Sequence, residues 1–576
     1  MRLAAALSRR RPATLIAVVA TVGTAILVVA CGLSPSTPVP SPPTPTPPAA
    51  AAPTICKNVA ADRGLAFRGA YGKTPGGTDP MAAMMLRNMG NGAAIADVWD
   101  DGSLSVLLLG QLGHSNRLFR NTLAATGTPN FVDVTEEAGL ANEGGSRVAA
   151  FADLDGDGRL DLVVMNDWDG ADGGSPSKVY RNAGDGTFAD VTEGSGFDPM
   201  GYLVGGLSLA DYDRDGLLDI YVTYWTMELG GDPAREAMSI KGRFPGMNRL
   251  FRNLGDFRFD DVTNDVHLGQ ITADSFSSVF ADFTGDGWPD LYVARDHRAD
   301  LFFENLQGEF RLASEEHGVD HVGNDMGIAV ADLGSDGALD LYVTNITDPN
   351  KEFGTGSGNT LLIGERATDG ALTYRDDAEP MGVMDTGWGW GAAFTDVDLD
   401  GRLDLYVVQG MQEFIGQKSP ELRDQAARLF LGSAGNGFTP ALDEGCGIPG
   451  DQRAVIPFDY DRDGAPDLLV TQVAYSTALL ENQTSDRHWL TIDLSRAGAA
   501  AAGARVTVDV GGVRSTQVSL LGGSYLAGMP QELYFGLGDA SSADAVTVTW
   551  ADGSLSVLGP IPGDQVLRVI PSGIVP

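Results

Sequence analysis

The fold of this chain is decided by the segment ADLDGDGRLDLVV at residues 152–164. Positions 1, 3, 5 and 9 of its loop carry carboxylates, and a Gly at position 6 permits a sharp turn; the four acids are Asp153, Asp155, Asp157 and Asp161. Oxygen ligands at this spacing can surround one hard cation, and Ca²⁺ accepts about six to eight of them in a flexible shell. The run after position 9 is strand-like, whereas an EF-hand needs flanking helices and a Glu at position 12. The segment therefore predicts a calcium loop between two strands.

Six further copies of this pattern occur, and their first Asp residues are 50 to 71 residues apart. Three are complete, with candidate ligands Asp211, Asp213, Asp215 and Asp219, then Asp396, Asp398, Asp400 and Asp404, then Asp459, Asp461, Asp463 and Asp467. Two have a substitution at position 3, with candidate ligands Asp282, Thr284, Asp286 and Asp290, then Asp332, Asp336 and Asp340 beside Gly334. The first copy keeps Asp97 and Asp101 but has Trp99 and Ser105 at other ligand positions.

Two interpretations of the repeated loops compete. Asp-Gly turns can simply form hairpins, but carboxylates clustered on one short loop repel one another unless a cation is present. We therefore expect about six or seven Ca²⁺ ions, since each loop can hold one. The sequence does not decide whether the first copy, with Asp97 and Asp101, binds a metal ion.

Strand signals between the loops complete each repeating unit. Examples are NRLFRN at residues 116–121 and 248–253, and FVDVT at residues 131–135. Each unit then contains four short strands joined by turns rich in Gly and Asp. Seven such units predict a seven-bladed β-propeller over residues 54–485, because radial repetition covers the sheet edges.

The N-terminal segment ICKNVAADRGLAF, residues 55–67, has the place of a fourth strand ahead of the first loop. The last unit lacks such a strand after TALLEN at residues 477–482. We predict that the N-terminal strand completes the last blade and closes the ring. Cys56 and Cys446 lie near the two ends of the repeat region, and in an exported compartment they either form a disulfide or remain as two shielded thiols.

Residues 486–576 change character and alternate short strands with Gly-rich turns, as in RVTVDV at residues 505–510 and AVTVTW at residues 545–550. This pattern predicts a small β-sandwich or barrel-like domain. The whole chain is thus expected to be all-β, a seven-bladed propeller followed by this domain.

The acidic loops resemble the FG-GAP/VCBS repeats of integrin-like propellers. GGSYLAG at residues 522–528 and LYFGLG at residues 533–538 look like the ASPIC/UnbV domain. Their pairing is similar to the cartilage acidic protein family and its bacterial relatives. The resemblance implies a calcium-stabilised, secreted or surface protein used for adhesion or scaffolding, with no established chemistry. The degenerate first loop departs from the family pattern.

The N-terminus predicts export. Arginines precede an apolar run at residues 13–30 that ends in VVAC at residues 28–31, which is the layout of a secretory signal. Its end resembles a lipobox, so residues 1–30 are expected to be a lipoprotein signal peptide and Cys31 the lipidated residue; a membrane-spanning anchor is the alternative. Residues 31–53 hold nine of the 30 prolines and no charge, which favours an extended stalk. We expect a cell-envelope lipoprotein, attached to a membrane by its lipid and facing either the cell surface or the periplasm.

The charge limits the partners. The chain has 77 acidic and 39 basic residues and a net charge of −38, which excludes nucleic-acid binding through a basic surface. Counting back from the loops places Arg147, Trp390 and Arg453 at the channel mouth opposite the calcium loops, with Asp325 and Trp388 nearby. Such a mixture suits an extracellular glycan or protein ligand. Ordinary filling of the channel is the alternative.

We predict from these features a calcium-binding, surface-tethered scaffold for adhesion or ligand binding, and not an enzyme. The alternative is a polysaccharide lyase or dehydratase, since propellers of this repeat type also occur in such enzymes. That function would need a His or Tyr base beside an Arg. The pair His317 and His321 has i,i+4 spacing but lacks the HExxH arrangement of a zinc enzyme, and no nucleophile elbow or phosphate loop is present.

Overall fold

The computed structural model describes most of the chain from residue 54 onward. The described ranges are 54–69, 87–111, 113–141, 145–167, 175–199, 203–225, 247–269, 274–348, 357–411, 425–435, 437–441 and 444–575, together with residue 422. The predicted signal peptide, Cys31 and the stalk lie outside these residues. Within them, no helix has both the length and the apolar character needed to cross a bilayer.

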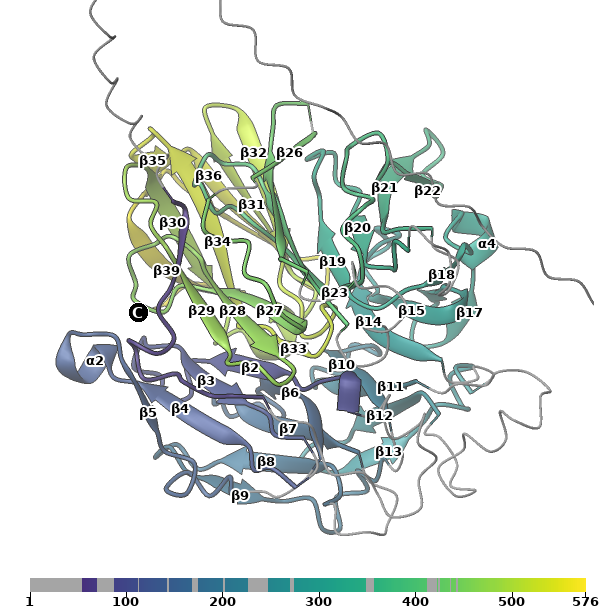
Figure 1. Ribbon diagram of the computed structural model, residues 1–576. Helices are drawn as coiled ribbons and strands as arrows, with labels where there is room; N and C mark the ends of the chain where they lie inside the picture. The colour runs from purple at the N-terminus through teal and green to yellow at the C-terminus, as the bar shows by residue number, and fades with distance from the viewer. Residues whose placement is uncertain are drawn as a thin grey trace, which may run out of the picture. The chain divides into compact units, whose positions relative to one another are not determined.

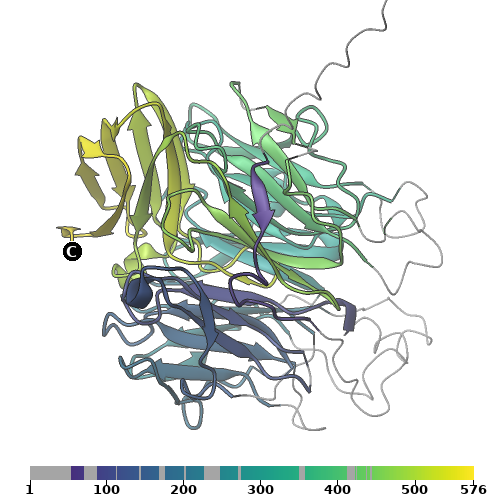
Figure 2. The same ribbon diagram turned by 60° about the vertical axis from the view of Figure 1, so that its left-hand side comes forward.

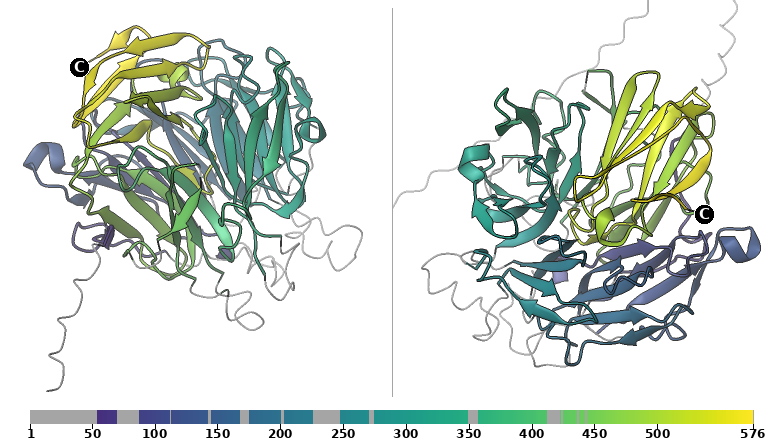
Figure 3. Two further views of the ribbon diagram at one scale, coloured as in Figure 1. Left: turned by 90° about the horizontal axis from the view of Figure 1, so that it is seen from above. Right: turned by 180° about the vertical axis from the view of Figure 1, so that it is seen from behind.

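Seven antiparallel sheets surround a common centre and form blades, numbered here in chain order, each with strands A to D (Figures 1 and 3). Blade 1 contains β2 (Ala93–Ala96), β3 (Ser105–Leu108), β4 (Arg117–Asn121) and β5 (Phe131–Asp133). Blade 2 contains β6 (Ser146–Ala152), β7 (Asp161–Asn166), β8 (Lys178–Asn182) and β9 (Phe188–Asp190). Blade 3 contains β10 (Val204–Ala210), β11 (Asp219–Tyr224), β12 (Arg249–Asn253) and β13 (Phe259–Asp261). Blade 4 contains β14 (Ser275–Ala281), β15 (Asp290–Ala299), β16 (Leu301–Asn305) and β17 (Phe310–Leu312), with β18 (Val322–Asn324) beside β15.

The remaining blades follow the same order. Blade 5 contains β19 (Ile328–Ala331), β20 (Asp340–Val343), β21 (Thr360–Arg366) and β22 (Leu372–Asp376). Blade 6 contains β23 (Gly389–Thr395), β24 (Asp404–Gln409), β25 (Arg428–Gly432) and β26 (Phe438–Pro440). Blade 7 contains β27 (Gln452–Phe458), β28 (Asp467–Gln472) and β29 (Ala478–Asn482), and its fourth strand is β1 (Cys56–Asn58). Two one-turn helices, α2 (Leu123–Thr126) and α4 (Ser314–His317), lie between strands. The predicted all-β propeller is confirmed.

The N-terminal strand closes the ring. β1 pairs antiparallel with β29, with Cys56 opposite Asn482, and Figure 2 shows it in purple against the green strands of blade 7. A disulfide joins Cys56 to Cys446, which lies between β26 and β27, and so links β1 to the chain that leads into the last blade. Of the two alternatives for these cysteines, the disulfide is the one present.

Burial explains the composition of the strands. Every residue of β6 and β7 is buried, because neighbouring blades pack face to face and cover both sides of strands A and B. The rim strands are covered only in part, so that in β5 the side chain of Phe131 is buried and those of Val132 and Asp133 are exposed. Strands A and B therefore read as continuous runs of apolar and small residues, as in SRVAAFA and DLVVMN.

Asparagines at the end of strand C connect adjacent blades. Each donates from Nδ2 to the backbone oxygen at position 2 of the preceding blade's acidic loop. These bonds are Asn121 to Tyr460, Asn182 to Val98, Asn253 to Leu154, Asn305 to Tyr212 and Asn482 to Val397. Blade 5 has Gly364 at this place, and Arg366 donates to Phe283 O in its stead. The last Asn of NRLFRN therefore has a structural role that its sequence motif does not explain.

The C-terminal domain is a sandwich of two four-stranded sheets around its own apolar core. One sheet contains β34 (Glu532–Gly538), β30 (His488–Asp493), β39 (Gln565–Ile570) and β40 (Gly573–Ile574). The other contains β32 (Val513–Val518), β31 (Arg505–Val510), β36 (Ala545–Thr549) and β37 (Leu555–Leu558). A short pair, β35 (Ser542–Ala543) and β38 (Ile561–Pro562), and one 3-10 turn, η2 (Gly498–Ala501), complete it.

A loop of this domain, residues 520–530, enters the centre of the propeller, and we call it the plug. Its strand β33 (Ala527–Gly528) pairs in parallel with β2, the innermost strand of blade 1 (Figure 1). Backbone bonds also join it to blades 3 and 5, where Leu209 N donates to Leu521 O and Ile328 N donates to Gly523 O. The plug thus occupies the channel that the sequence alone leaves open.

Aromatic packing and small residues fit the plug to the channel. The ring of Tyr525 lies 4.9 Å from that of Trp390 in blade 6 and 5.6 Å from that of Phe276 in blade 4. A Cβ on Gly528 would lie 2.3 Å from Ala149 O, closer than a side chain can approach. The glycines of GGSYLAG are therefore required by the close approach of the blades.

The disulfide generates a prediction for stability. Replacing Cys446 by Ser should lower the free energy of unfolding by about 2–5 kcal/mol, because the bridge spans 390 residues and restricts the unfolded chain. Thermal denaturation monitored by circular dichroism measures the loss. Cys31→Ser is the control and should leave the melting temperature unchanged. If Cys446→Ser and the parent protein have the same melting temperature, strand pairing alone closes the ring.

Candidate metal centres

The acidic loops connect strands A and B, so they lie together at one end of the blades. In each complete copy, one carboxylate oxygen from each of positions 1, 3 and 9 lies within 4.8 Å of the others. The four clusters are Asp153, Asp155 and Asp161; Asp211, Asp213 and Asp219; Asp396, Asp398 and Asp404; and Asp459, Asp461 and Asp467. The structure therefore brings together the ligands predicted at these three positions.

Backbone amides hold each loop in a tight turn. In blade 2, Gly156 N donates to Asp153 Oδ1 and Gly158 N donates to Asp153 Oδ2, at 2.8 and 3.0 Å. Asp161 is the first residue of β7 and accepts two further bonds, from Leu154 N in the loop and from Asn182 N in strand C. One bond from the loop and one from strand C also reach Asp219, Asp290, Asp340, Asp404 and Asp467, and only at Asp290 does the loop donor lie at position 3, which is Thr284.

Burial and mutual repulsion raise the pKa of these carboxyl groups. Burial, together with the nearby charges of Asp155 and Asp153, raises the pKa of Asp161 from 3.8 to about 7. The pKa of Asp396 rises to about 8 for the same two reasons, and that of Asp467 rises well above its ordinary value. A rise from 3.8 to about 7 corresponds to roughly 4 kcal/mol of preference for the protonated form. Keeping the clusters ionised near neutral pH therefore requires positive charge.

Several loop oxygens lack a protein partner. Among the described residues, Asp459 Oδ1, Asp461 Oδ1 and Thr284 Oγ1 are buried without a hydrogen bond. Oxygen donors of this kind, clustered and desolvated, fit Ca²⁺, which binds oxygen ligands in a flexible shell. Thr284 lies in the substituted loop of blade 4, whose Asp282 and Asp290 also have raised pKa values because of burial.

Position 5 lies outside the clusters formed by positions 1, 3 and 9, and it pairs with arginines, as Asp155 and Asp213 at position 3 also do. Asp157 accepts from Arg159 N and pairs with the Arg159 guanidinium, and Asp400 pairs with Arg402 at 2.7 Å. Of the predicted position-5 ligands, Asp157, Asp215, Asp400 and Asp463 lie outside the three-carboxylate clusters. In the substituted loop of blade 5, Asp332 accepts from Asp336 N and Asp336 accepts from Ala338 N, so the turn is kept without an acid at position 3.

Arginines face the degenerate first loop. Arg120 lies 3.0 Å from Asp101, and Arg568 of the C-terminal domain lies 3.9 Å from Asp97 and 3.2 Å from Asp100. Ser105 replaces the position-9 acid and retains one of its bonds, by accepting from Asn121 N. Guanidinium groups therefore supply positive charge beside Asp97 and Asp101.

The C-terminal domain contacts other acidic loops as well. Gly536 N donates to Asp396 Oδ2 at 3.0 Å, and Arg505 donates to Asp282 O and, at 2.8 Å, to Gly337 O. Arg462, inside the loop of blade 7, pairs with the buried Glu532 at 2.7 Å. Folding of the loops and docking of the domain are thus coupled through shared contacts.

The five residues predicted to lie at or near the channel mouth as ligand-binding candidates are all buried. Arg453 is fully buried, lies 4.2 Å from the ring centre of Trp390 and pairs with Asp451 at 2.7 Å. Arg147 is likewise buried and pairs with Asp167.

The two remaining members of that set are buried too. Trp388 is 6% exposed, and Asp325 is fully buried. The sequence could not show that the plug fills the channel, because the plug follows all seven blades in the chain. Arg147, Trp390 and Arg453 therefore fill the channel, which was the alternative to ligand binding.

Comparison with protein-family models agrees with this architecture. The model of the FG-GAP-like repeat matches residues 97–164, 167–222, 231–293 and 282–343, and the model named ASPIC and UnbV matches residues 495–574. The chain carries FG-GAP repeats and a C-terminal ASPIC/UnbV domain. The FG-GAP matches begin at the first acidic loop, and the ASPIC/UnbV match contains the plug.

The two-domain chain is homologous to cartilage acidic protein 1. It is 25% identical to the Homo sapiens protein over 487 residues, which cover 81% of this chain and 69% of that protein. It is 24% identical to the Mus musculus protein over 492 residues, covering 81% and 71%. The resemblance inferred from the sequence motifs is confirmed.

Among the solved structures that match is that of an Agrocybe aegerita lectin, described as recognising non-reducing terminal N-acetylglucosamine. Its TM-score is 0.38 and its identity 17%, over 69% of this chain and 94% of the lectin. Similarity at this level does not carry a ligand from one protein to the other.

The raised pKa values predict how calcium and pH act together on the FG-GAP propeller. In chelator, the stability contributed by protonated loop carboxyls should be lost as pH rises from about 4, the unfolded pKa, through about 7 to 8, the folded values of Asp161 and Asp396. Saturating Ca²⁺ replaces those protons, so the rise in melting temperature caused by Ca²⁺ should increase from about pH 5 to about pH 8. Differential scanning calorimetry with Ca²⁺, Mg²⁺ or chelator measures it, Mg²⁺ being the control. A calcium effect that is constant or decreases with pH would contradict the assignment.

Proposed function

We propose that the protein is a calcium-stabilised propeller scaffold, exported and attached to a membrane at Cys31, that binds an extracellular glycan or protein ligand. The observation that carries the proposal is the set of four buried or partly buried three-carboxylate clusters, whose loops all contact the C-terminal domain. Ca²⁺ in the four complete loops would add positive charge to carboxylates that arginines such as Arg181 and Arg252 neutralise only in part, and the substituted loops of blades 4 and 5 offer two further sites. Homology to cartilage acidic protein 1 supports a scaffold rather than an enzyme.

The covered face limits where a ligand can bind. The C-terminal domain contacts the acidic loops of blades 1, 4, 5, 6 and 7, so these loops are not available to a large partner. We therefore propose that a ligand binds at the opposite end of the blades, where strands B and C are connected. Val322, 53% exposed on β18, and the half-exposed His297 next to it at the end of β15 belong to that surface.

A binding screen tests the ligand part of the proposal. Residues 52–576, one compact unit, should bind a glycan or extracellular protein on an array in Ca²⁺ and lose most of that binding in chelator. Val322→Asp should weaken binding at least about tenfold, whereas Leu555→Asp, on the exposed edge of the sandwich, is the matched control and should not. If binding is unchanged both in chelator and in the Val322→Asp variant, the scaffold model is refuted. Cleavage of a polysaccharide by the protein would favour a lyase.

Attachment to the membrane has its own test. The full chain should incorporate labelled fatty acid and sediment with membranes, and Cys31→Ser should abolish both, because the thiol is the acyl acceptor. Cys446→Ser is the control and should remain in the membrane fraction. If Cys31→Ser still sediments with membranes, residues 13–30 act as a spanning anchor instead.

A further inference from the structure

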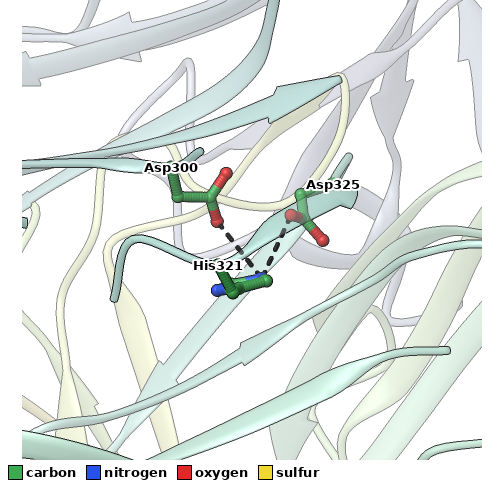
Figure 4. Close-up of side chains that lie close together, drawn as sticks. All are labelled: Asp300, His321 and Asp325. Atoms are coloured by element: carbon green, nitrogen blue, oxygen red, sulfur yellow. Dashed lines mark ion pairs between the residues drawn. The ribbon is translucent and has the colours of Figure 1, made fainter. Parts of the chain in front are cut away.

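A polar cluster of a different kind lies at the junction of blades 4 and 5, at the end of the blades away from the acidic loops. It consists of Asp300, between β15 and β16, and of His321 and Asp325, on either side of β18 (Figure 4). β15 is longer than the second strand of any other blade, and its extension pairs with β18, with Ala299 opposite Val322. This local addition to the repeat brings the three side chains together.

The two carboxylates converge on one nitrogen. Asp325 Oδ2 lies 3.1 Å and Asp300 Oδ2 lies 3.8 Å from His321 Nε2, and both Asp side chains are fully buried (Figure 4). Despite the short contact, neither His321 Nε2 nor Asp325 Oδ2 makes a hydrogen bond among the described residues. A ring nitrogen carries at most one hydrogen, so it cannot satisfy two carboxylates.

Surrounding groups fix both carboxylates in this orientation. Arg295 N donates to Asp300 Oδ1 at 2.7 Å, and the hydroxyl of Tyr292 donates to Asp300 Oδ2 at 2.5 Å. Asn345 Nδ2 donates to Asp325 Oδ1 at 2.8 Å. These bonds hold each carboxylate in place, and Oδ2 of both groups is directed at the imidazole, that of Asp300 while it also accepts from Tyr292. Outer hydrogen bonds of this kind orient the ligands of metal sites.

The propeller does not need negative charge at Asp300. At the corresponding place in blades 1, 3 and 5, a neutral amide accepts the same backbone bond. These amides are Asn116, Asn248 and Asn359, which accept from Gly110 N, Tyr224 N and Asn345 N. Asp325, seven residues before the first loop acid, corresponds to Ser146 in blade 2 and Ser275 in blade 4. Burying a carboxylate costs several kcal/mol unless a cation accompanies it, and the imidazole of His321 can carry only one positive charge for the two carboxylates beside it.

We propose that Asp300, His321 and Asp325 bind one divalent transition-metal ion of the Zn²⁺ or Mn²⁺ type. An imidazole nitrogen beside two carboxylates suits these ions, whereas Ca²⁺ is bound by oxygen ligands alone. The site therefore differs chemically from the acidic loops. Three protein ligands leave a coordination position for water or for an oxygen of a bound partner.

His317 takes no part in this site; it ends α4, and the chain leaves the helix at Gly318, so His321 is not on the same helix. Its Nδ1 contacts Leu372 O at 2.8 Å and its Nε2 contacts Glu304 Oε1 at 2.9 Å, so both ring nitrogens are engaged. His317 and His321, the i,i+4 pair of the sequence, therefore contact different groups and do not form one site.

Metal titration tests the proposal. With the acidic loops saturated by Ca²⁺, the full chain is dialysed against Zn²⁺ or Mn²⁺ and its metal content is measured by atomic spectroscopy. One additional ion should bind per chain. The variants His321→Gln, Asp300→Asn and Asp325→Ser should each weaken its binding at least about tenfold. The last two restore residues that other blades already carry, so they should fold.

His488→Gln is the matched control, because His488 pairs with a single exposed carboxylate, Asp564, at 2.8 Å. It should bind the additional ion as the parent protein does. Melting temperatures in chelator and Ca²⁺ binding verify that each variant is folded and that the loops are intact. If folded His321→Gln, Asp300→Asn and Asp325→Ser retain the ion, or if the parent binds neither Zn²⁺ nor Mn²⁺ in excess Ca²⁺, the assignment is overturned.

Discussion

The buried aspartate at position 9 of the acidic loops is the group on which the rest of the structure depends. In blade 2, Asp161 accepts one backbone bond from its own loop and one from strand C, so a single side chain fixes the loop, strand B and strand C together. Five other blades repeat this arrangement, and blade 1 keeps half of it through Ser105. Because these carboxylates are desolvated and face others, each also creates a local need for positive charge.

The molecule meets that need in two ways. Arginines stand beside some loops, such as Arg568 at blade 1 and Arg252 beside Asp213 in blade 3, and clustered oxygens suit a cation in the complete loops. The C-terminal domain covers this charged end and sends the plug into the channel. The disulfide and β1 close the rim. The plug therefore stabilises the centre of the propeller, the C-terminal domain covers its charged end, and β1 with the disulfide closes its rim.

Features that depend on a local sequence pattern could be predicted from the sequence. The loops such as Asp153–Asp161 recur with fixed spacing, so the blade count, the ligand clusters and the closing strand followed from the repeat. Contacts between segments that are distant in the sequence could not be predicted. Arg453 and Trp390 have the composition of a binding mouth, but the plug around Tyr525 buries them.

The cluster at blades 4 and 5 was missed for a different reason. His321 suggested a helical pair with His317, whereas its partners are contributed by strand pairing between β15 and β18. The available signal was Asp300, a charged residue where NRLFRN begins with an amide in blades 1 and 3.

The plug also sets the order in which the protein can be completed. Residues 520–530 are synthesised after every blade, yet they fill the space that the innermost strands surround. Without residues 520–530, the channel-facing rings of Phe276 and Trp390 would lose their packing against Tyr525. The centre of the propeller is therefore completed only by the last domain to be synthesised.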